Sequence, residues 1–236
     1  MRLFITRPQK ECNETSKRLK NLGHQTLEAP LFEIEAIKLE PQKEIGALIV
    51  TSLNGVRSLG HLNLNKSLPV FTVGDRTANE AQKNGFQNIH SAKGTEQDLI
   101  ALILEKSDGI NGKFIHFSGE NIKGDLVGAL KLRNIKAKRE VTYRAKALNV
   151  MPKTLLRAIK LKEIDGGVFY SGRAATTFNK MIARNGLLEN LGGLTAFALS
   201  EDIGASLKEL GWKNIIVAKA PNEDELFKQI ETYCLN

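Results

Sequence analysis

Short apolar runs alternate with longer amphipathic stretches along most of this chain. The apolar runs lie at 3–6, 47–50, 70–73, 88–90, 114–117, 167–170, 196–199 and 215–218. Strands buried on both faces of a parallel sheet have this continuous apolar character. The amphipathic stretches predict helices at 14–22, 78–84, 96–105, 125–132, 174–185 and 202–210. Strands that alternate with helices indicate an α/β fold built on parallel sheets.

The chain also repeats its own pattern at slowly changing intervals. A shift of 126 residues places Phe71 on Phe197 and Gly85 on Gly211, and a shift of 119 places Ser52 on Ser171. A drifting interval is what loop insertions in a duplicated unit produce. We therefore expect two five-stranded units of roughly 110 residues, a size that suits small doubly wound domains. Gly85 and Gly211, with Gly186, follow predicted helices and are expected to adopt the left-handed conformation of a helix C-terminus.

Two segments alternate in a period of two instead. Residues 29–37 alternate apolar with acidic positions, and residues 140–148 alternate apolar with basic positions. This period is typical of strands with one exposed face, and opposite charges favour pairing between neighbouring strands. The two segments are predicted to be antiparallel linker strands.

Composition is that of an ordinary globular protein, with 236 residues of which 42% are hydrophobic. A chain of this length buries enough apolar surface to fold without a disulfide or a structural metal. Met1 leads directly into the first predicted strand, which argues against a secretory signal, and no run is apolar enough to span a membrane. Cys12 and Cys234 match no metal-ligand spacing, so a reduced, cytoplasmic protein is expected.

The net charge of +8 is concentrated in one segment. Residues 123–162 contain twelve Lys or Arg and two acidic residues. Such a segment could attract nucleic acid or a small polyanion, or it could form a solvated helix face with its loops. Aromatic residues between the basic ones, typical of binding to single-stranded nucleic acid, are limited to Tyr143.

Small hydroxyl residues, often beside glycine, follow nearly every predicted strand. In open α/β sheets ligands bind beyond these carboxyl ends, and backbone N–H groups there suit carboxylate or phosphate oxygens. The alternative is that Ser52, Thr77, Ser171 and Ser200 only cap the helices that follow them. Phosphate-loop, dinucleotide and hydrolase motifs are absent, and the four histidines are scattered. His116, inside an apolar strand, is expected to be a hydrogen-bonded core residue. Any catalysis is therefore expected to depend on positioning and electrostatics.

In this order, the strand ends resemble those of the uroporphyrinogen-III synthase family over about residues 3–230. The matching pieces are Ile5-Thr6-Arg7-Pro8, Glu28-Ala29-Pro30-Leu31, Ile49-Val50-Thr51-Ser52 with Asn54-Gly55-Val56, Thr72-Val73-Gly74 with Thr77-Ala78, Phe117-Ser118-Gly119, Val141-Thr142-Tyr143, Val168-Phe169-Tyr170-Ser171, and Ala198-Leu199-Ser200 ahead of Leu210-Gly211-Trp212. Each piece alone is weak, but the ordered set in a duplicated chain is specific.

The resemblance implies two flavodoxin-like domains joined by the linker strands at about 29–37 and 140–148. The first would comprise residues 1–34 and 147–236, and the second residues 37–142. Strands one and two of each repeat would then lie with strands three to five of the other. The active site would lie in the cleft between the domains.

The resemblance also implies an activity, that of a hydro-lyase in haem biosynthesis. Such an enzyme closes hydroxymethylbilane, a linear tetrapyrrole with eight carboxylates, into uroporphyrinogen III with inversion of the last ring and loss of water. No cofactor, metal, membrane or nucleic acid is implied. A monomer is expected, with at most transient contact with the deaminase that makes the substrate.

Individual residues take roles from the same resemblance. Tyr143 aligns with a linker tyrosine that could assist departure of the hydroxyl, although it could equally be a packing residue. Thr77 aligns with a threonine of the cleft. The residues placed to hold carboxylates are Ser52, Asn54, Ser118, Gly119, Ser171 and Ser200. The chain departs from several relatives at 200–203, where Ser-Glu-Asp-Ile replaces a threonine-containing turn and brings acidic side chains instead.

Two other functions are compatible with these observations. A two-domain module could close on a small anion without reacting with it, since fold does not fix function. A nucleic-acid binder using residues 123–162 is the other possibility, and the scarcity of aromatic residues there weighs against it.

Overall fold

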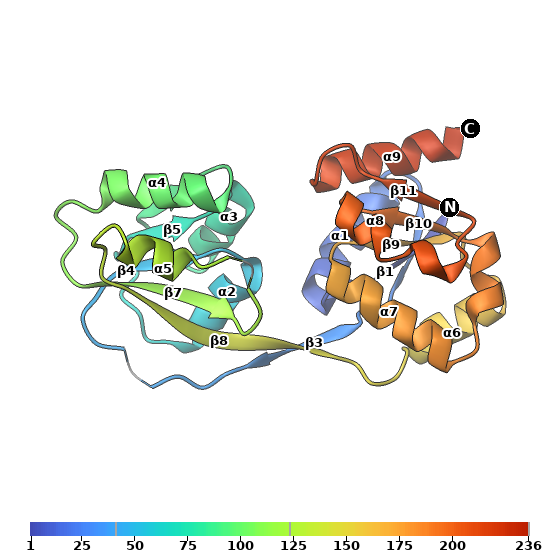
Figure 1. Ribbon diagram of the computed structural model, residues 1–236, viewed down its shortest axis with the longest axis horizontal. Helices are drawn as coiled ribbons and strands as arrows, with labels where there is room; N and C mark the ends of the chain where they lie inside the picture. The colour runs from blue at the N-terminus through green and yellow to red at the C-terminus, as the bar shows by residue number, and fades with distance from the viewer. Residues whose placement is uncertain (41, 123, 236) are drawn as a thin grey trace. The chain divides into compact units, whose positions relative to one another are not determined.

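A computed structural model describes residues 1–40, 42–122 and 124–235, so Lys123 of the basic segment lies outside the described residues (Figure 1). The chain forms two compact units. Unit 1 comprises Met1–Glu33 and Lys146–Asn236, and unit 2 comprises Ile34–Ala145. The sequence predicted two independent domains, one of residues 1–34 and 147–236 and the other of residues 37–142. Their independence and these limits stay a prediction.

Unit 1 contains a five-stranded parallel sheet in the order β11-β10-β9-β1-β2. Its strands are β1 (Arg2–Ile5), β2 (Gln25–Glu28), β9 (Gly166–Phe169), β10 (Thr195–Ala198) and β11 (Asn214–Val217). Its α-helices are α1 (Gln9–Asn21), α6 (Lys153–Lys160), α7 (Gly172–Arg184), α8 (Glu201–Ala205) and α9 (Glu223–Leu235), and the 3-10 helices are η2 (Leu188–Gly193) and η3 (Lys208–Leu210).

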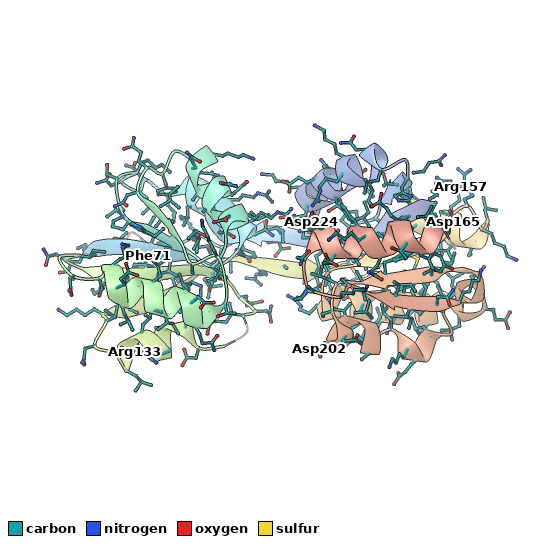
Figure 2. The ribbon with its side chains drawn as sticks, turned by 90° about the horizontal axis from the view of Figure 1, so that it is seen from above. Phe71, Arg133, Arg157, Asp165, Asp202 and Asp224 are labelled. Carbon is teal, nitrogen blue, oxygen red and sulfur yellow. The ribbon has the colours of Figure 1, made fainter. Side chains whose placement is uncertain are left out.

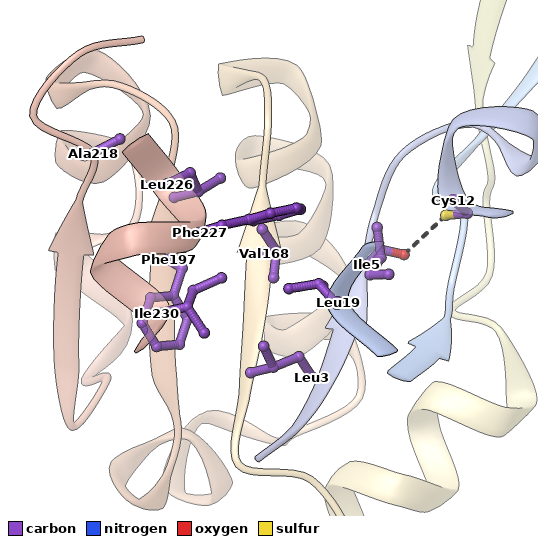
Figure 3. Packing of buried hydrophobic residues seen from close by; sticks show 10 residues of the cluster. All are labelled: Leu3, Ile5, Cys12, Leu19, Val168, Phe197, Ala218, Leu226, Phe227 and Ile230. Atoms are coloured by element: carbon purple, nitrogen blue, oxygen red, sulfur yellow. Dashed lines mark hydrogen bonds between the residues drawn. The ribbon is translucent and has the colours of Figure 1, made fainter. Parts of the chain in front are cut away.

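Helices cover both faces of this sheet. On one face, side chains of β1, β9 and β10 pack against α1 and α9 (Figure 3); the buried cluster includes Leu3, Ile5, Leu19, Val168, Phe197, Leu226 and Ile230. On the other face Phe4 and Phe169 pack against Phe178 of α7, with ring centroids 5.2 and 5.3 Å from that of Phe178. A doubly wound unit results.

Unit 2 contains a six-stranded sheet in the order β3-β8-β7-β4-β5-β6. The strands are β3 (Phe32–Ala36), which begins in unit 1, then β4 (Ile45–Val50), β5 (Val70–Thr72), β6 (Ile89–Ser91), β7 (Lys113–Gly119) and β8 (Ala137–Ala147), which ends in unit 1. The helices are α2 (Leu53–Ser58), η1 (Leu59–His61), α3 (Asp75–Lys83), α4 (Glu96–Lys106) and α5 (Leu126–Lys131).

This sheet too is covered on both faces. Ala47, Ile49, Phe71 and Phe114 form a buried cluster with residues of α4 and α5; Phe71 is labelled in Figure 2. The alternate positions of the same strands face the other way. Leu48, Val50, Ile115 and Phe117 pack with residues of α2 and α3. The expected fold class, α/β with doubly wound parallel sheets, is confirmed.

The two repeats of the sequence exchange strands. Unit 1 combines β1 and β2 of the first repeat with β9, β10 and β11 of the second, and unit 2 combines β7 and β8 with β4, β5 and β6. With strands numbered within their repeats, the sheet of unit 1 has the 2-1-3-4-5 order of flavodoxin-like folds, and the sheet of unit 2 has the same order with β3 added at its edge. This is the exchange that the resemblance implied.

The alternating segments form a pair of neighbouring strands. In unit 1 the Leu148 N–H donates to the Leu31 carbonyl (2.9 Å), and in unit 2 the Ile37 N–H donates to the Thr142 carbonyl (2.8 Å). The residue numbers of the hydrogen-bonded partners fall along one strand as they rise along the other, so the two strands are antiparallel. β8 also pairs in parallel with β7 as far as Tyr143, so the second alternating segment begins inside a core strand.

One predicted helix is wrong in its extent. The stretch 202–210 is not one helix, because α8 ends at Ala205 and η3 follows. Ser206 Oγ donates to the Asp202 carbonyl at 2.9 Å, a local bond that competes with helical ones. The predicted left-handed glycines are confirmed, with φ of +87° at Gly85, +64° at Gly186 and +71° at Gly211. Among the described residues, no helix is long and apolar enough to cross a membrane.

The close approach of β9 to Phe4 gives a first prediction. A Cβ at Gly167 would lie 2.1 Å from the Phe4 ring, and Phe4 is fully buried. We expect Gly167→Ala to lower the free energy of unfolding by about 1–3 kcal/mol, as overpacked cores do. Urea denaturation measures this. Gly193→Ala is the control, since a Cβ there meets no described atom within 4 Å. Equal stability of the two variants would contradict this account of the core.

Candidate functional site

Each sheet has one place where the helices after two neighbouring strands leave toward opposite faces. In unit 2 this occurs between β7, followed by α5, and β4, followed by α2, because α5 and α2 pack on different faces. In unit 1 it occurs between β1 and β9, followed by α1 and α7. The crevice at such a switch point is where open α/β sheets bind ligands.

The switch point of unit 2 is open. A pocket of about 210 Å³ lies there, at the carboxyl ends of β4, β5, β7 and β8. Its lining residues are Thr51, Ser52, Val73, Glu96, His116, Ser118, Gly119, Asn121, Ile122 and Tyr143. Four of the residues predicted from the sequence therefore lie together: Ser52, Ser118, Gly119 and Tyr143.

Tyr143 is held in this pocket by a hydroxyl and by a glycine. Its hydroxyl lies 3.0 Å from Ser52 Oγ, which also accepts the Gly55 N–H at 3.0 Å as the N-cap of α2. Either hydroxyl can be the donor in this contact, because a serine oxygen has two lone pairs and can accept from both Gly55 and Tyr143. Ser52 thus has both roles considered from the sequence, that of a cap and that of a pocket residue.

Gly119 provides the space for the tyrosine ring. A Cβ at this position would lie 2.7 Å from Tyr143 Cζ and 2.9 Å from its hydroxyl oxygen. The register between β7 and β8 shifts here, so that Gly119 lies opposite Tyr143 and Thr142 is the extra residue. Bulges of this kind change the direction of a side chain and are common beside active sites.

Arg139 fixes the turn that follows β7. Its Nε donates to Ser118 Oγ at 2.9 Å, and its Nη2 donates to the carbonyls of Gly119 and Glu120, each at 2.7 Å. The guanidinium is therefore engaged by the protein itself. Thr142 Oγ1 adds a bond to the Ser118 carbonyl at 3.2 Å. The sequence did not predict this role for Arg139 or Thr142, because both bond to residues at the end of another strand, β7.

His116 is the most deeply buried ionisable residue of the pocket lining, at 2% exposure. Burial, and secondarily the positive charge of Arg139, lowers its pKa from 6.5 to about 4. Nε2 lies 3.3 Å from Thr51 Oγ1, and within the described residues Nδ1 has no hydrogen-bond partner. His116 is thus a neutral, half-satisfied strand residue, close to the core role expected for it.

Two other predicted residues of unit 2 do not line the pocket. Asn54 is half-buried in the first turn of α2, and Thr77 lies inside α3 with 8% exposure. Because Gly74 is the N-cap of α3, a capping role for Thr77 is wrong. Their proposed contacts with a ligand stay predictions.

Ser171 and Ser200 belong to unit 1 and follow the neighbouring strands β9 and β10. Ser171 Oγ accepts the Ala174 N–H at 3.2 Å and so caps α7. Ser200 is the N-cap of α8, with no side-chain capping bond among the described residues. Glu201 and Asp202 are exposed in the first turn of that helix, where the helix dipole favours acidic side chains.

The switch point of unit 1 is filled by side chains. Arg7, after β1, and Tyr170, after β9, both bond to Glu223 at the start of α9, each at 2.8 Å. The Arg7 guanidinium also lies 4.2 Å from the centre of the Tyr170 ring. Arg7 and Tyr170 are visible in the sequence as strand-end residues, but Glu223 is not. Only the fold brings the start of the last helix to these strands.

Within the described residues, no group of three or more His, Cys, Asp or Glu could hold a metal ion. The polar groups that line the pocket are hydroxyls, backbone groups, the Asn121 amide, the Glu96 carboxyl group and one neutral imidazole.

Known proteins resemble this chain over nearly its full length. A family model described as uroporphyrinogen-III synthase HemD matches residues 13–228. A porphyrin biosynthesis protein HemD of Ruminiclostridium josui is 23% identical over 98% of this chain and 48% of its own length. The chain thus spans about half the length of that relative.

Two solved structures share the fold. The uroporphyrinogen-III synthetase of Helicobacter pylori superimposes with a TM-score of 0.64 at 20% identity, covering 99% of this chain and all of the other. A mutant uroporphyrinogen III synthase of Thermus thermophilus gives a TM-score of 0.53 at 16% identity, covering 100% of this chain and 98% of the other.

The buried imidazole makes stability depend on pH. An unfolded histidine, with a pKa near 6.5, binds a proton between pH 6.5 and 4, whereas folded His116 does not. Its contribution to stability is therefore complete above pH 6.5 and is lost as pH falls toward 4, by on the order of 3 kcal/mol. We expect His116→Gln to flatten this part of the curve of unfolding free energy against pH. His61→Gln, at an exposed position, is the control; an unchanged slope in the first variant would contradict the burial argument.

The contact between Gly119 and Tyr143 predicts non-additive mutations. Gly119→Ala is expected to lower stability by about 1–3 kcal/mol, because the tyrosine ring must move. In a Tyr143→Leu background that penalty should fall by more than half, which chemical denaturation of the four proteins of the cycle measures. Gly74→Ala, where a Cβ meets no described atom within 4 Å, serves as control. Strict additivity would mean that the ring does not rest on Gly119.

Proposed function

This chain belongs to the uroporphyrinogen-III synthase family, and on that premise we propose that it closes hydroxymethylbilane into uroporphyrinogen III, with inversion of the last pyrrole ring and release of water. The observation that carries the proposal is the tyrosine pocket at the switch point of unit 2. There Tyr143, Ser52 and Gly119 form a hydroxyl site at the carboxyl ends of the strands.

Tyr143 is the proposed general acid. The departing hydroxyl of the first ring takes the phenol proton and leaves as water, which generates an electrophilic azafulvene. The substituted carbon of the last ring attacks it, and the resulting spiro intermediate fragments and recloses with that ring inverted. The pyrrole proton released along the way restores the phenol. Ser52 is proposed to support this role by donating to the phenol oxygen, 3.0 Å away, so that the phenol proton is directed to the substrate.

The surroundings of the phenol suit such chemistry. His116 is held neutral near pH 7 by burial and by Arg139, so it adds no positive charge beside a developing carbocation. The rest of the catalysis is proposed to come from positioning, which alone can lower an activation barrier by several kcal/mol when reacting atoms are held close together.

Carboxylates of the substrate are proposed to bind at the strand ends. In unit 2 the candidates are Ser118, Gly119, Asn54 and Thr77, and in unit 1 they are Ser171 and Ser200. The net charge of +8 supports attraction of a polyanion. Arg139 is assigned to the turn after β7 and not to the substrate, because its guanidinium is already engaged. We further propose that the chain acts as a monomer, with transient contact with the deaminase.

A coupled assay tests the proposal. Hydroxymethylbilane is generated in situ by its deaminase with and without this protein, and the oxidised porphyrin isomers are separated by chromatography. Isomer III formed only with the protein supports the proposal. Isomer I alone, the product of uncatalysed closure, in the presence of folded protein would reject catalysis and favour an anion-binding module.

The same assay tests the tyrosine. Tyr143→Phe removes the acidic proton and keeps the ring on Gly119, so kcat is expected to fall about ten- to a hundredfold, as for loss of a general acid. Tyr233→Phe is the matched control: Tyr233 bonds to Thr195 and Asn214 in unit 1 and does not line the pocket. If Tyr143→Phe turns over like the wild type, the tyrosine has no chemical role.

A further inference from the structure

Glu223 is surrounded by hydrogen-bond donors that belong to other parts of unit 1. Its Oε1 accepts from Arg7 Nη1 and the Tyr170 hydroxyl, each at 2.8 Å, and from Thr15 Oγ1 at 2.9 Å. Its Oε2 accepts from Arg18 Nη1. The Glu223 side chain is 11% exposed, so this carboxylate is largely removed from water.

These donors lie on elements other than α9, and one of them, Arg18, also stacks on Phe227 of that helix. Arg7 and Tyr170 follow β1 and β9, and Arg18 and Thr15 lie on α1, which packs against the same strands. Two cations and two hydroxyls thus converge at the switch point of unit 1, in the manner of an anion site. Glu223 enters from the first turn of the last helix. Its neighbour Asp224 also contacts Arg18 but is 76% exposed (Figure 2).

Unit 2 offers a direct comparison. Its helix α4 follows β6 as α9 follows β11, and the first residue of α4 is also a glutamate, Glu96, which lines the open pocket at that unit's switch point. In unit 1 the corresponding glutamate occupies the switch point itself. A carboxylate in this place satisfies Arg7, whose side chain is 13% exposed and would otherwise be buried without a counter-charge, which is costly. It also pairs with the more exposed Arg18. Any other carboxylate of suitable reach would satisfy them equally well.

We propose that Arg7, Thr15, Arg18 and Tyr170 form a carboxylate-binding site, which Glu223 occupies until a carboxylate of the ligand displaces it. The exchange replaces one carboxylate by another, so the arginines stay compensated throughout. Displacement frees the start of α9. The identification of the ligand as a tetrapyrrole, with one carboxylate arm in this site, rests on the proposed function. The existence of the carboxylate site does not.

Chemical rescue tests the site without any assay of activity. Glu223→Ala leaves the donors without their carboxylate, and thermal unfolding is followed in sodium acetate and in sodium chloride at equal ionic strength. We expect the variant to unfold below the wild type in chloride and to regain at least half of the lost Tm in acetate, in a saturable manner. Adding Arg7→Met should abolish the recovery.

Glu163→Ala is the matched control. Glu163 also contacts two arginines, Arg2 at 3.5 Å and Arg157 at 3.6 Å, but it does so at the surface. Wild type and this control should unfold alike in the two salts. No acetate effect in Glu223→Ala, or the same effect in all three proteins, would overturn the proposal.

The wild type tests displacement directly and does not depend on a variant that folds. Uroporphyrin I, a stable cyclic octacarboxylate, serves as the probe, and hydrogen exchange of residues 223–227 is compared with and without it. We expect exchange there to become several-fold faster with the probe, while residues 172–184 of α7 stay unchanged. Unchanged exchange in 223–227 at saturating probe would overturn displacement of Glu223.

The two proposals can fail separately. Isomer I alone in the coupled assay, together with acetate rescue of Glu223→Ala, would reject the proposed function and keep the carboxylate site. Isomer III without acetate rescue would reject the site and keep the function.

Discussion

The parallel pairing of β4 with β7 in unit 2, and of β1 with β9 in unit 1, is the constraint on which the rest of the structure depends. Each pair joins strands from different repeats of the sequence. Each also places two strand ends side by side whose following helices leave toward opposite faces. The switch points, and with them every polar cluster described above, exist only because these pairs form. Neither repeat of the sequence could build such a site alone.

Several arginines of this protein bond to its own backbone and side chains, and so stabilise the fold. Arg139 holds three acceptors around the turn after β7, and Arg57 pairs with Glu80 at 2.7 Å between α2 and α3. The net charge of +8 therefore overstates the number of cationic groups that are available to bind a ligand. A lysine ammonium is a compact charge on a flexible stem, whereas the planar arginine guanidinium suits the fixed, multiple bonds that turns require. Long-range attraction of a polyanion and short-range binding of its carboxylates thus depend on different residues.

The sequence alone predicts the features that depend on local chemistry. Apolar runs give the strand centres, and Gly85, Gly186 and Gly211 adopt the left-handed conformation because other residues rarely can. The break after Ala205, where Ser206 Oγ bonds back to the Asp202 carbonyl, was not predicted from the pattern of apolar residues. In the site, Ser52 and Tyr143 were found through resemblance. Their contact depends on a bulge between β7 and β8, and the Glu223 cluster depends on where α9 begins. Both are set by packing between distant segments, which has no local signature.

The two switch points differ in a way that their chemistry explains. In unit 2 the side chains at the ends of β4 and β7 that line the pocket are hydroxyls and a neutral imidazole, and the nearby Arg139 is already bonded to the turn after β7, so the pocket can stay open. In unit 1 the end of β1 presents Arg7, and burial of such a cation requires an anion; Arg18 of α1, at 44% exposure, adds a second positive charge. Burial opposes ionisation of Glu223, yet the bond from Tyr170 and the charges of Arg7 and Arg18 outweigh it and lower its pKa. Burial and the negative charge of Glu223 raise the pKa of Tyr170. The Tyr170 phenol therefore stays protonated and donates to Glu223. A duplicated fold has thus produced one site that can stay open and one that must be filled, and the difference follows from the two arginines.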